Sequence, residues 1–165
     1  RVAVQVDKHW HVLALYLACL RAGLVYLPLN TGYQRGELEY FFADAKPRVI
    51  VCQPDRLGAI AVGQRATTVL TLAELVDRAA SEPAAFATVP RAADDLAAIL
   101  YTSGTTGRSK GAMITHRNLA SNALALVAEW GFTRGDVLLH ALPIYHVHGL
   151  FVATHCALLS GSRML

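Results

Sequence analysis

Residues 101–111, with the sequence YTSGTTGRSKG, combine glycines, hydroxyls and cations in one short segment. The segment holds three glycines, five Ser or Thr hydroxyls, and the two cations Arg108 and Lys110. Glycine lets backbone N–H groups turn toward a ligand, hydroxyls donate to anionic oxygens, and lysine adds a positive point charge. Apolar residues lie directly before it (96–100) and after it (112–114), which predicts a loop between two strands. We therefore expect a loop that binds a polyphosphate.

Two other interpretations of this segment are a Walker A loop and an ordinary hairpin turn. Walker A requires G-x-x-x-x-G-K-[ST], whereas Ser109 precedes Lys110 here and Gly111 follows it. The residues beyond Lys110 also favour a strand, so we expect no helix N-terminus at the phosphate. A turn that only reverses the chain, with Lys110 as a solvated lysine, stays open. Turns rarely need so many hydroxyls together with a lysine.

The longer segment YTSGTTGRSKGAMITHRN resembles the phosphate-binding signature of the adenylate-forming enzymes. This superfamily contains acyl-CoA synthetases, luciferases and peptide-synthetase adenylation domains. Ser109 stands where the family usually has proline. Two more segments resemble family motifs and follow in the family's order, LRAGLVYLPLN at 20–30 and LPIYHVHGL at 142–150. Within the superfamily, the chain most resembles the malonyl-CoA synthetases.

The resemblance implies an acid–thiol ligase that activates malonate or methylmalonate with ATP. The acyl-adenylate and pyrophosphate would form first, and transfer to coenzyme A would then release AMP. ATP, Mg²⁺ and coenzyme A are the implied cofactors and co-substrates. Lys110 and Thr102 are the expected catalytic residues, although the family tolerates variety at Arg108. The expected nucleotide-binding residues are Thr102, Ser103, Gly104, Thr105, Thr106, Gly107, Arg108, Ser109 and Lys110.

Three histidines, His140, His146 and His148, form a second candidate group. His-x-His is a metal-ligand spacing, but no Cys or carboxylate lies nearby, so we predict no metal site. By resemblance, His146, His148 and Gly149 line the acid pocket, with His148 on its wall and His146 at the gate beside it. Malonate has a second carboxylate that needs polar partners when buried. The alternative, histidines that only pack in the core or a loop, stays open.

Composition limits the classes of partner. The 165 residues are 54% hydrophobic and only 16% charged, so we expect part of the surface to be covered by further chain. A net charge of +3 with scattered basic residues predicts no nucleic-acid partner. Cys19, Cys52 and Cys156 lie far apart in apolar runs, which predicts buried free thiols. No apolar run is long enough to predict a membrane span.

Strands and helices are expected to alternate along the chain. We predict strands at 2–6, 25–29, 48–52, 67–70, 96–100, 112–114, 137–142 and 162–165, and helices at 9–22, 35–45, 72–80, 116–130 and 149–159. Asp7, Thr71 and Thr115 are the expected caps of three of these helices. Alternation implies an α/β fold with a mainly parallel sheet, helices on both faces, and ligands at the carboxyl ends of its strands.

By resemblance, residues 1–165 are part of the large N-terminal AMP-binding domain, with sub-parts 1–80 and 95–165 joined by a linker at 81–94. A C-terminal domain of the same parent chain is the expected partner, and the 165 residues alone are expected to be inactive. The cytoplasm is the expected location, with an organelle such as the mitochondrion as the alternative. Alternative functions are a synthetase for a fatty or aryl acid, a peptide-synthetase adenylation domain that loads a carrier protein, and a non-catalytic nucleotide-binding module.

Overall fold

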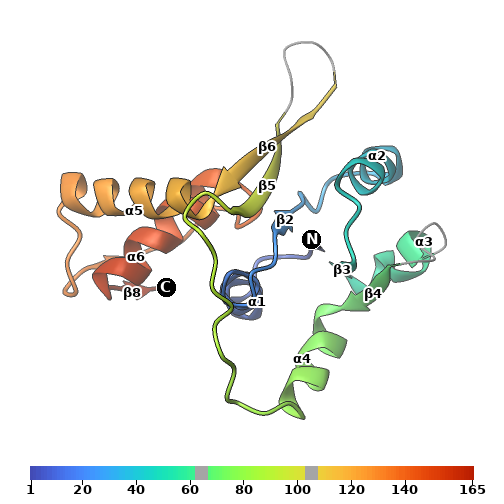
Figure 1. The fold of residues 1–165 in the computed structure, drawn as a ribbon, viewed down its shortest axis with the longest axis horizontal. Coiled ribbons are helices and arrows are strands. Elements are labelled where there is room, and N and C mark those ends of the chain that lie inside the picture. Colours follow the sequence, from blue (N-terminus) through green and yellow to red (C-terminus); the bar gives the residue numbers. More distant parts are fainter. Residues whose placement is uncertain (62–66, 103–107) are drawn as a thin grey trace.

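The computed structural model describes residues 1–61, 67–102 and 108–165. Six strands form one sheet in the order β4-β3-β1-β2-β5-β6 (Figure 1). All neighbouring strands are parallel except β5 and β6, which form an antiparallel hairpin. The predicted α/β fold with a mainly parallel sheet is confirmed. The strands are β1 (Val2–Gln5), β2 (Tyr26–Pro28), β3 (Val49–Cys52), β4 (Thr68–Thr71), β5 (Leu96–Thr102) and β6 (Lys110–Thr115).

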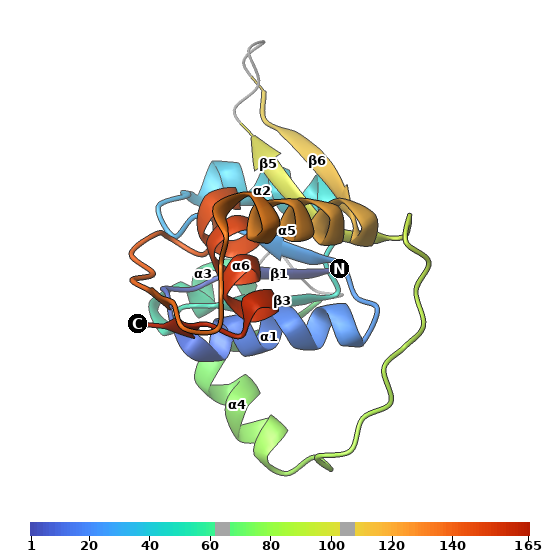
Figure 2. The ribbon, with the colours of Figure 1, turned by 90° about the vertical axis from the view of Figure 1, so that its left-hand side faces the viewer.

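Successive side chains of a strand point to opposite faces of the sheet. Both faces of this sheet carry apolar side chains, and helices cover both. On one face, Val4 and Leu100 pack in a core with α1 (Trp10–Arg21), α4 (Leu72–Ala80) and α5 (His116–Trp130). On the other face, Ala3 and Ile99 pack in a core with α2 (Arg35–Ala45) and α3 (Leu57–Ala61). Figure 2 looks onto the first of these faces, where α1 and α5 lie toward the viewer.

Local sequence signals set several helix ends. The side chains of Thr71 and Thr115 accept the N–H groups of Glu74 and Asn118, each at 3.2 Å, so both predicted caps are confirmed. The predicted cap at Asp7 is wrong. The residue directly before α1 with extended backbone is His9 (φ −153°, ψ 151°), and its Nδ1 accepts the N–H of His11 at 3.2 Å.

The chain after α5 is less regular than predicted. Instead of a strand over 137–142, β7 (Val137–Leu138) has two residues and pairs in parallel with β8 (Arg163–Met164) in a separate sheet. A tight turn ends β7, because the N–H of Ala141 donates to the carbonyl of Leu139 at 3.0 Å. The predicted helix over 149–159 is a π-helical segment, η2 (His148–Ala153), that continues into α6 (Thr154–Ser160). Two short elements were not predicted, α3 and the 3₁₀ turn η1 (Pro54–Arg56).

Residues 81–94 run without helix or strand along the outside of the molecule (Figure 2). The segment is tied to the end of α1, since Arg21 donates to the carbonyl of Phe86 and accepts the N–H of Val89, both at 2.8 Å. All three cysteines are buried and free, as predicted. Among the helices of the described ranges, none has the length and apolar character needed to cross a membrane.

Candidate functional site

A cavity of about 360 Å³ lies at the carboxyl ends of β2 and β5. Parallel strands place their carboxyl ends at one edge of a sheet, which is where ligands bind in α/β folds. The walls come from the turn after β2, from α2, from the base of the β5–β6 loop, and from the loop before η2. The lining residues are Pro28, Asn30, Tyr33, Glu37, Leu100, Tyr101, Thr102, Ser109, Tyr145, His146 and Val147.

The loop end of the β5–β6 hairpin brings part of the predicted phosphate loop to this cavity. Thr102 and Ser109 line it, while Lys110 is exposed and pairs directly opposite Thr102 in the ladder. A strand follows the loop, as predicted, so no helix N-terminus follows Lys110. The other predicted nucleotide-binding residues, Ser103, Gly104, Thr105, Thr106 and Gly107, lie outside the described residues.

Arg108 and Ser109 both contact α2. The Arg108 guanidinium lies 4.5 Å from the centroid of the Tyr40 ring, a cation–π distance. The Tyr40 hydroxyl donates to the carbonyl oxygen of Ser109 at 2.8 Å. The predicted loop is therefore attached to a helix that lies far from it in the sequence.

His146 and His148 differ in their position relative to the cavity. Both side chains are exposed, but of the two only His146 belongs to the cavity lining. Their rings stack, with centroids 5.5 Å apart and planes at 11°. The backbone N–H of His148 donates to His146 Nδ1 at 3.5 Å, so this contact leaves Nε2–H as the donor of His146.

Gly149 lies under the loop that carries these histidines. A Cβ atom at this position would lie 2.1 Å from the carbonyl oxygen of Pro143, so only glycine fits. Gly149 is buried and absent from the cavity lining. Its place beneath Pro143 makes it a residue that shapes the loop.

His140 is buried, and hydrogen bonds hold both of its ring nitrogens. Nε2 lies 2.9 Å from the carbonyl oxygen of Gly149 and 3.1 Å from the hydroxyl of Thr154. A carbonyl only accepts, so Nε2 carries the proton and Nδ1 accepts from the Lys8 ammonium at 2.8 Å. Lys8 also donates to the carbonyl oxygen of His140, and burial lowers the pKa of Lys8. His140 therefore anchors the loop before η2 to the segment that precedes α1.

Several lining residues were not among the predicted site residues. Tyr33 and Glu37 come from the turn after β2 and from α2, and Asn30 directly follows the buried residue Leu29. A polar residue at the end of a buried strand was a usable signal for Asn30. The pKa of Tyr33 is raised by burial and by nearby Glu37 and Tyr145, so its hydroxyl stays a neutral hydrogen-bond donor.

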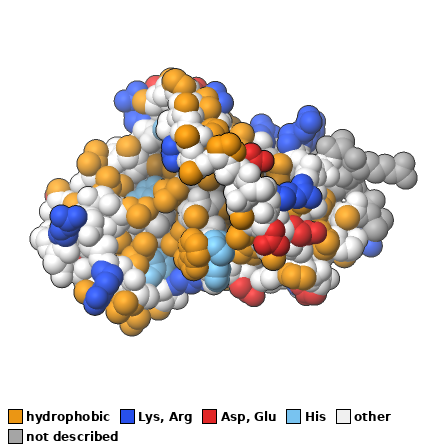
Figure 3. All heavy atoms as spheres, turned by 90° about the horizontal axis from the view of Figure 1, so that it is seen from below, with side chains coloured by type: hydrophobic (Ala, Val, Ile, Leu, Met, Phe, Trp, Pro, Cys, Tyr) orange, Lys and Arg blue, Asp and Glu red, His pale blue; other side chains and the backbone are white. Residues whose placement is uncertain are grey.

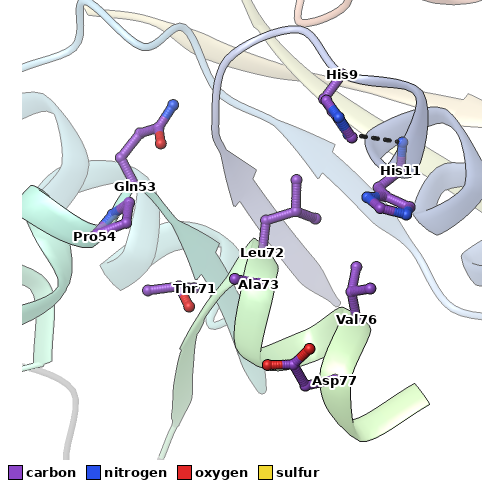
Figure 4. Close-up of a pocket in the computed structure, with 9 residues that line it drawn as sticks. All are labelled: His9, His11, Gln53, Pro54, Thr71, Leu72, Ala73, Val76 and Asp77. Atoms are coloured by element: carbon purple, nitrogen blue, oxygen red, sulfur yellow. Dashed lines mark hydrogen bonds between the residues drawn. The ribbon is translucent and has the colours of Figure 1, made fainter. Parts of the chain in front are cut away.

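A second cavity, of about 400 Å³, lies between the starts of α1 and α4 (Figure 4). His9 and His11 line one side, with Gln53 and Pro54 after β3 and Asp77 on α4. Within the described parts of the chain, no three His, Cys, Asp or Glu side chains are placed to hold a metal ion. Figure 3 shows histidines among apolar side chains on the lower face of the molecule.

Comparison with known proteins identifies the family of this chain. The whole chain, residues 1–165, matches the AMP-binding enzyme family, and the chain belongs to that family. It is 37% identical over 156 residues to the mitochondrial malonate–CoA ligase ACSF3 of Mus musculus, which covers 92% of this chain and 27% of that protein. It is 32% identical over 165 residues to a feruloyl-CoA synthase of an Amycolatopsis species, covering 100% of this chain and 33% of that protein.

A solved structure agrees closely with the fold. ATP-bound MatB from Rhodopseudomonas palustris superposes with a TM-score of 0.95 and is 56% identical, covering 99% of this chain and 34% of MatB. The chain thus spans between 27% and 34% of the length of these relatives.

Proposed function

We propose that the protein to which this chain belongs activates a small carboxylic acid with ATP and transfers the acyl group to coenzyme A. Malonate is the favoured acid. The observation that carries the proposal is a cavity that two motifs share. In it, Thr102 and Ser109 of the hairpin meet Tyr145, His146 and Val147 of the 142–150 segment. Similarity to a malonate–CoA ligase and to ATP-bound MatB supports both halves of this assignment.

The proposed chemistry has two steps. A carboxylate oxygen of the acid attacks the α-phosphorus of ATP, and the bond from that phosphorus to pyrophosphate breaks. The sulfur of coenzyme A, having lost its proton, then attacks the acyl carbon, and the bond to AMP breaks. Negative charge moves from the carboxylate to pyrophosphate in the first step and from the thiolate sulfur to AMP in the second, so positioning and fixed positive charge are what the protein must supply. Lys110 is the proposed source of charge and Thr102 of a hydroxyl donor.

Similarity to a solved structure supports ATP, whereas Mg²⁺ and coenzyme A are part of the proposal. The likeness to ATP-bound MatB supports ATP as the nucleotide. We propose that Mg²⁺ arrives on the ATP phosphates, whose charge it neutralises. The described residues bring no metal-binding group of three together, and neither step above uses a residue of this chain as a metal ligand. Coenzyme A and a C-terminal domain of the same parent chain complete the proposal.

The wall of the cavity suits an acid with a polar far end. Asn30, Tyr33 and His146 offer hydrogen-bond donors beside apolar Leu100 and Val147. A second carboxylate buried without such partners would carry a large desolvation penalty. Glu37 also lines the cavity. Its Oε2 accepts the N–H of Gln34 at 2.9 Å, so one of its carboxylate oxygens already has a hydrogen-bond donor.

AMP release by the full-length protein with ATP, Mg²⁺ and coenzyme A tests the proposal. The acids to compare are malonate, methylmalonate, acetate and a medium-chain fatty acid. We expect the two dicarboxylates to react at least roughly ten-fold faster, since a site built for a polar group rejects analogues that lack it. A preference for acetate or the fatty acid would contradict malonate as the substrate, but it would leave the proposed adenylation reaction intact. No AMP release with any acid would contradict the adenylation itself.

Activation of an aryl acid is a second candidate. The similarity to feruloyl-CoA synthase extends over the whole chain, and Tyr33 and Tyr145 give the cavity aromatic walls. Ferulate added to the same set of acids separates the two candidates, because the proposed dicarboxylate pocket should use it poorly.

A further inference from the structure

One face of α2 contacts β5 and the loop residue that directly precedes β6. Tyr40 and Asp44 are four residues apart, so they lie one above the other on the same side of the helix. The Tyr40 hydroxyl donates to the carbonyl of Ser109 at 2.8 Å, and Asp44 Oδ2 accepts the hydroxyl of Tyr101 at 2.5 Å. Tyr101 and Ser109 directly precede Thr102 and Lys110, which pair opposite each other at the loop end of the hairpin. The helix therefore holds the hairpin on both sides of its loop, at the residue before each member of this pair.

Packing around the two hydrogen bonds strengthens the contact. The Tyr101 ring lies 4.2 Å from the Phe41 ring and 6.1 Å from the Tyr40 ring, measured between centroids. The Arg108 guanidinium covers the Tyr40 ring at 4.5 Å. Gly111 leaves room for the Tyr101 ring, because a Cβ there would lie 3.4 Å from the ring and 3.0 Å from Ile99.

Helix α2, which makes this contact, is itself firmly packed on the sheet. Leu38, Phe41, Phe42 and Ala45 of α2 are all buried against the sheet. The helix is also fixed at its start, where Glu37 Oε2 accepts the backbone N–H of Gln34 at 2.9 Å. A shift of the loop end of the hairpin relative to α2 would therefore break the hydrogen bonds to Tyr40 or Asp44.

We propose that Tyr40 and Asp44 are positioning residues, which hold Thr102, Ser109 and Lys110 in the arrangement that binds ATP. Neither residue lines the cavity, so both act through Ser109 and Tyr101. The inference rests on the proposed function for the identity of the ligand. The attachment itself is given by the contacts of the described residues.

Three variants of the full-length protein test the proposal. Tyr40→Phe keeps the ring and its packing but removes the donor to Ser109, and Asp44→Ala removes the acceptor of Tyr101. Glu39→Gln is the matched control, because Glu39 lies on the exposed side of α2 and pairs with Arg35 at 2.6 Å. The measurements are ATP affinity by titration without acid, the KM of the acid, and residue-resolved amide hydrogen exchange without ATP.

We expect Tyr40→Phe and Asp44→Ala each to weaken ATP binding on the order of five-fold, the typical effect of one lost hydrogen bond. Exchange at Thr102 and Lys110 should rise by a similar factor, while the KM of the acid stays within about two-fold. Glu39→Gln should match the wild type in all three measurements. A selective effect of this kind separates positioning from general stability.

Two outcomes would overturn the proposal. One is ATP affinity and exchange in both variants equal to those of Glu39→Gln. The other is exchange that rises evenly over the whole sheet, which would make the two residues general stabilisers. A wild-type protein without ATP affinity would contradict the proposed function instead. Exchange at Thr102 and Lys110 would then still decide whether Tyr40 and Asp44 hold the hairpin.

Discussion

His140, His146 and His148 lie close together in the sequence, yet their neighbours give them different positions. His140 is buried with both ring nitrogens bonded, so it serves the structure of the loop. His146 and His148 are both exposed, and of the two only His146 lines the cavity. At the residue scale, contacts rather than residue type therefore select the candidate for binding the acid.

Lys110 carries the first prediction at this scale. Lys110→Met in the full-length protein should slow pyrophosphate release by roughly 100-fold or more, because losing a well-placed charged donor costs about 2.7–4 kcal/mol of barrier. Lys46→Met, at an exposed lysine at the end of α2, is the control and should keep the wild-type rate. Equal rates in the two variants would mean that Lys110 is a solvated lysine beside a turn.

Gly149 carries a prediction about stability. Gly149→Ala places a methyl group 2.1 Å from the Pro143 carbonyl, so we expect a loss of about 1–3 kcal/mol in the free energy of unfolding. Gly36→Ala is the control, because nothing lies within 4 Å of a Cβ at that helical position. The control should stabilise α2 by up to about 1 kcal/mol. Urea unfolding of the full-length protein measures both, and a neutral Gly149→Ala would contradict the close approach.

At the element scale, side-chain hydrogen bonds join elements that are distant in the sequence. α2 holds the β5–β6 hairpin through Tyr40 and Asp44. On the opposite face of the sheet, α1 and α6 meet at a bond of 2.8 Å between the Tyr16 hydroxyl and His155 Nε2. Both partners of this second bond are buried, so it should respond to the protonation of His155.

Burial lowers the pKa of His155, which predicts how stability depends on pH. The unfolded chain takes up a proton near the ordinary pKa of about 6.5, whereas the folded chain resists it down to lower pH. Stability from this group is therefore complete above about pH 6.5 and is lost as the pH falls toward the lower folded-state pKa.

Melting temperatures measured above and below about pH 6.5 check this dependence. His155→Gln in the full-length protein should lose less of its melting temperature on acidification than the wild type, because the titrating group is gone. His148→Gln removes an exposed histidine outside the helix caps and should behave like the wild type. Equal losses in all three proteins would show that His155 does not titrate on unfolding in this range.

At the scale of the whole molecule, the cavity exists only because four separate parts of the chain meet. The turn after β2, α2, the hairpin and the loop before η2 each supply part of its wall. A parallel sheet brings these parts to one edge, since the carboxyl ends of β2 and β5 lie side by side. Residues of the two predicted motifs can therefore contact one ligand.

This arrangement predicts a difference between two neighbouring histidines. His146→Ala should raise the KM of the acid about ten-fold, as expected for a lost hydrogen bond to a charged group, and leave the KM of ATP unchanged. His148→Ala, which removes a side chain outside the lining, should change the KM of the acid by less than about two-fold. Kinetics of AMP release with both variants measure this, and the reverse order would place His148 on the acid instead.

Much of the fold was predictable because local signals set it. The bounds of α2, the caps Thr71 and Thr115, and the strand on each side of the loop follow from apolar periodicity and capping patterns. The predictions failed where distant contacts take over. β7 ends early, beside a turn and the buried His140. No local sequence pattern marks Lys8 as the hydrogen-bond partner of His140.

The sequence by itself determined the fold class, the family and the segments that carry chemistry, because periodicity, caps and motif spacing are local properties of the chain. Only the tertiary structure decided which histidine lines the cavity, that His140 is bound to Lys8, and that α2 holds the hairpin. The physical reason is that burial and hydrogen-bond partners depend on contacts between residues far apart in the sequence. Such contacts follow from how the sheet and helices pack, and spacing along the chain does not encode them.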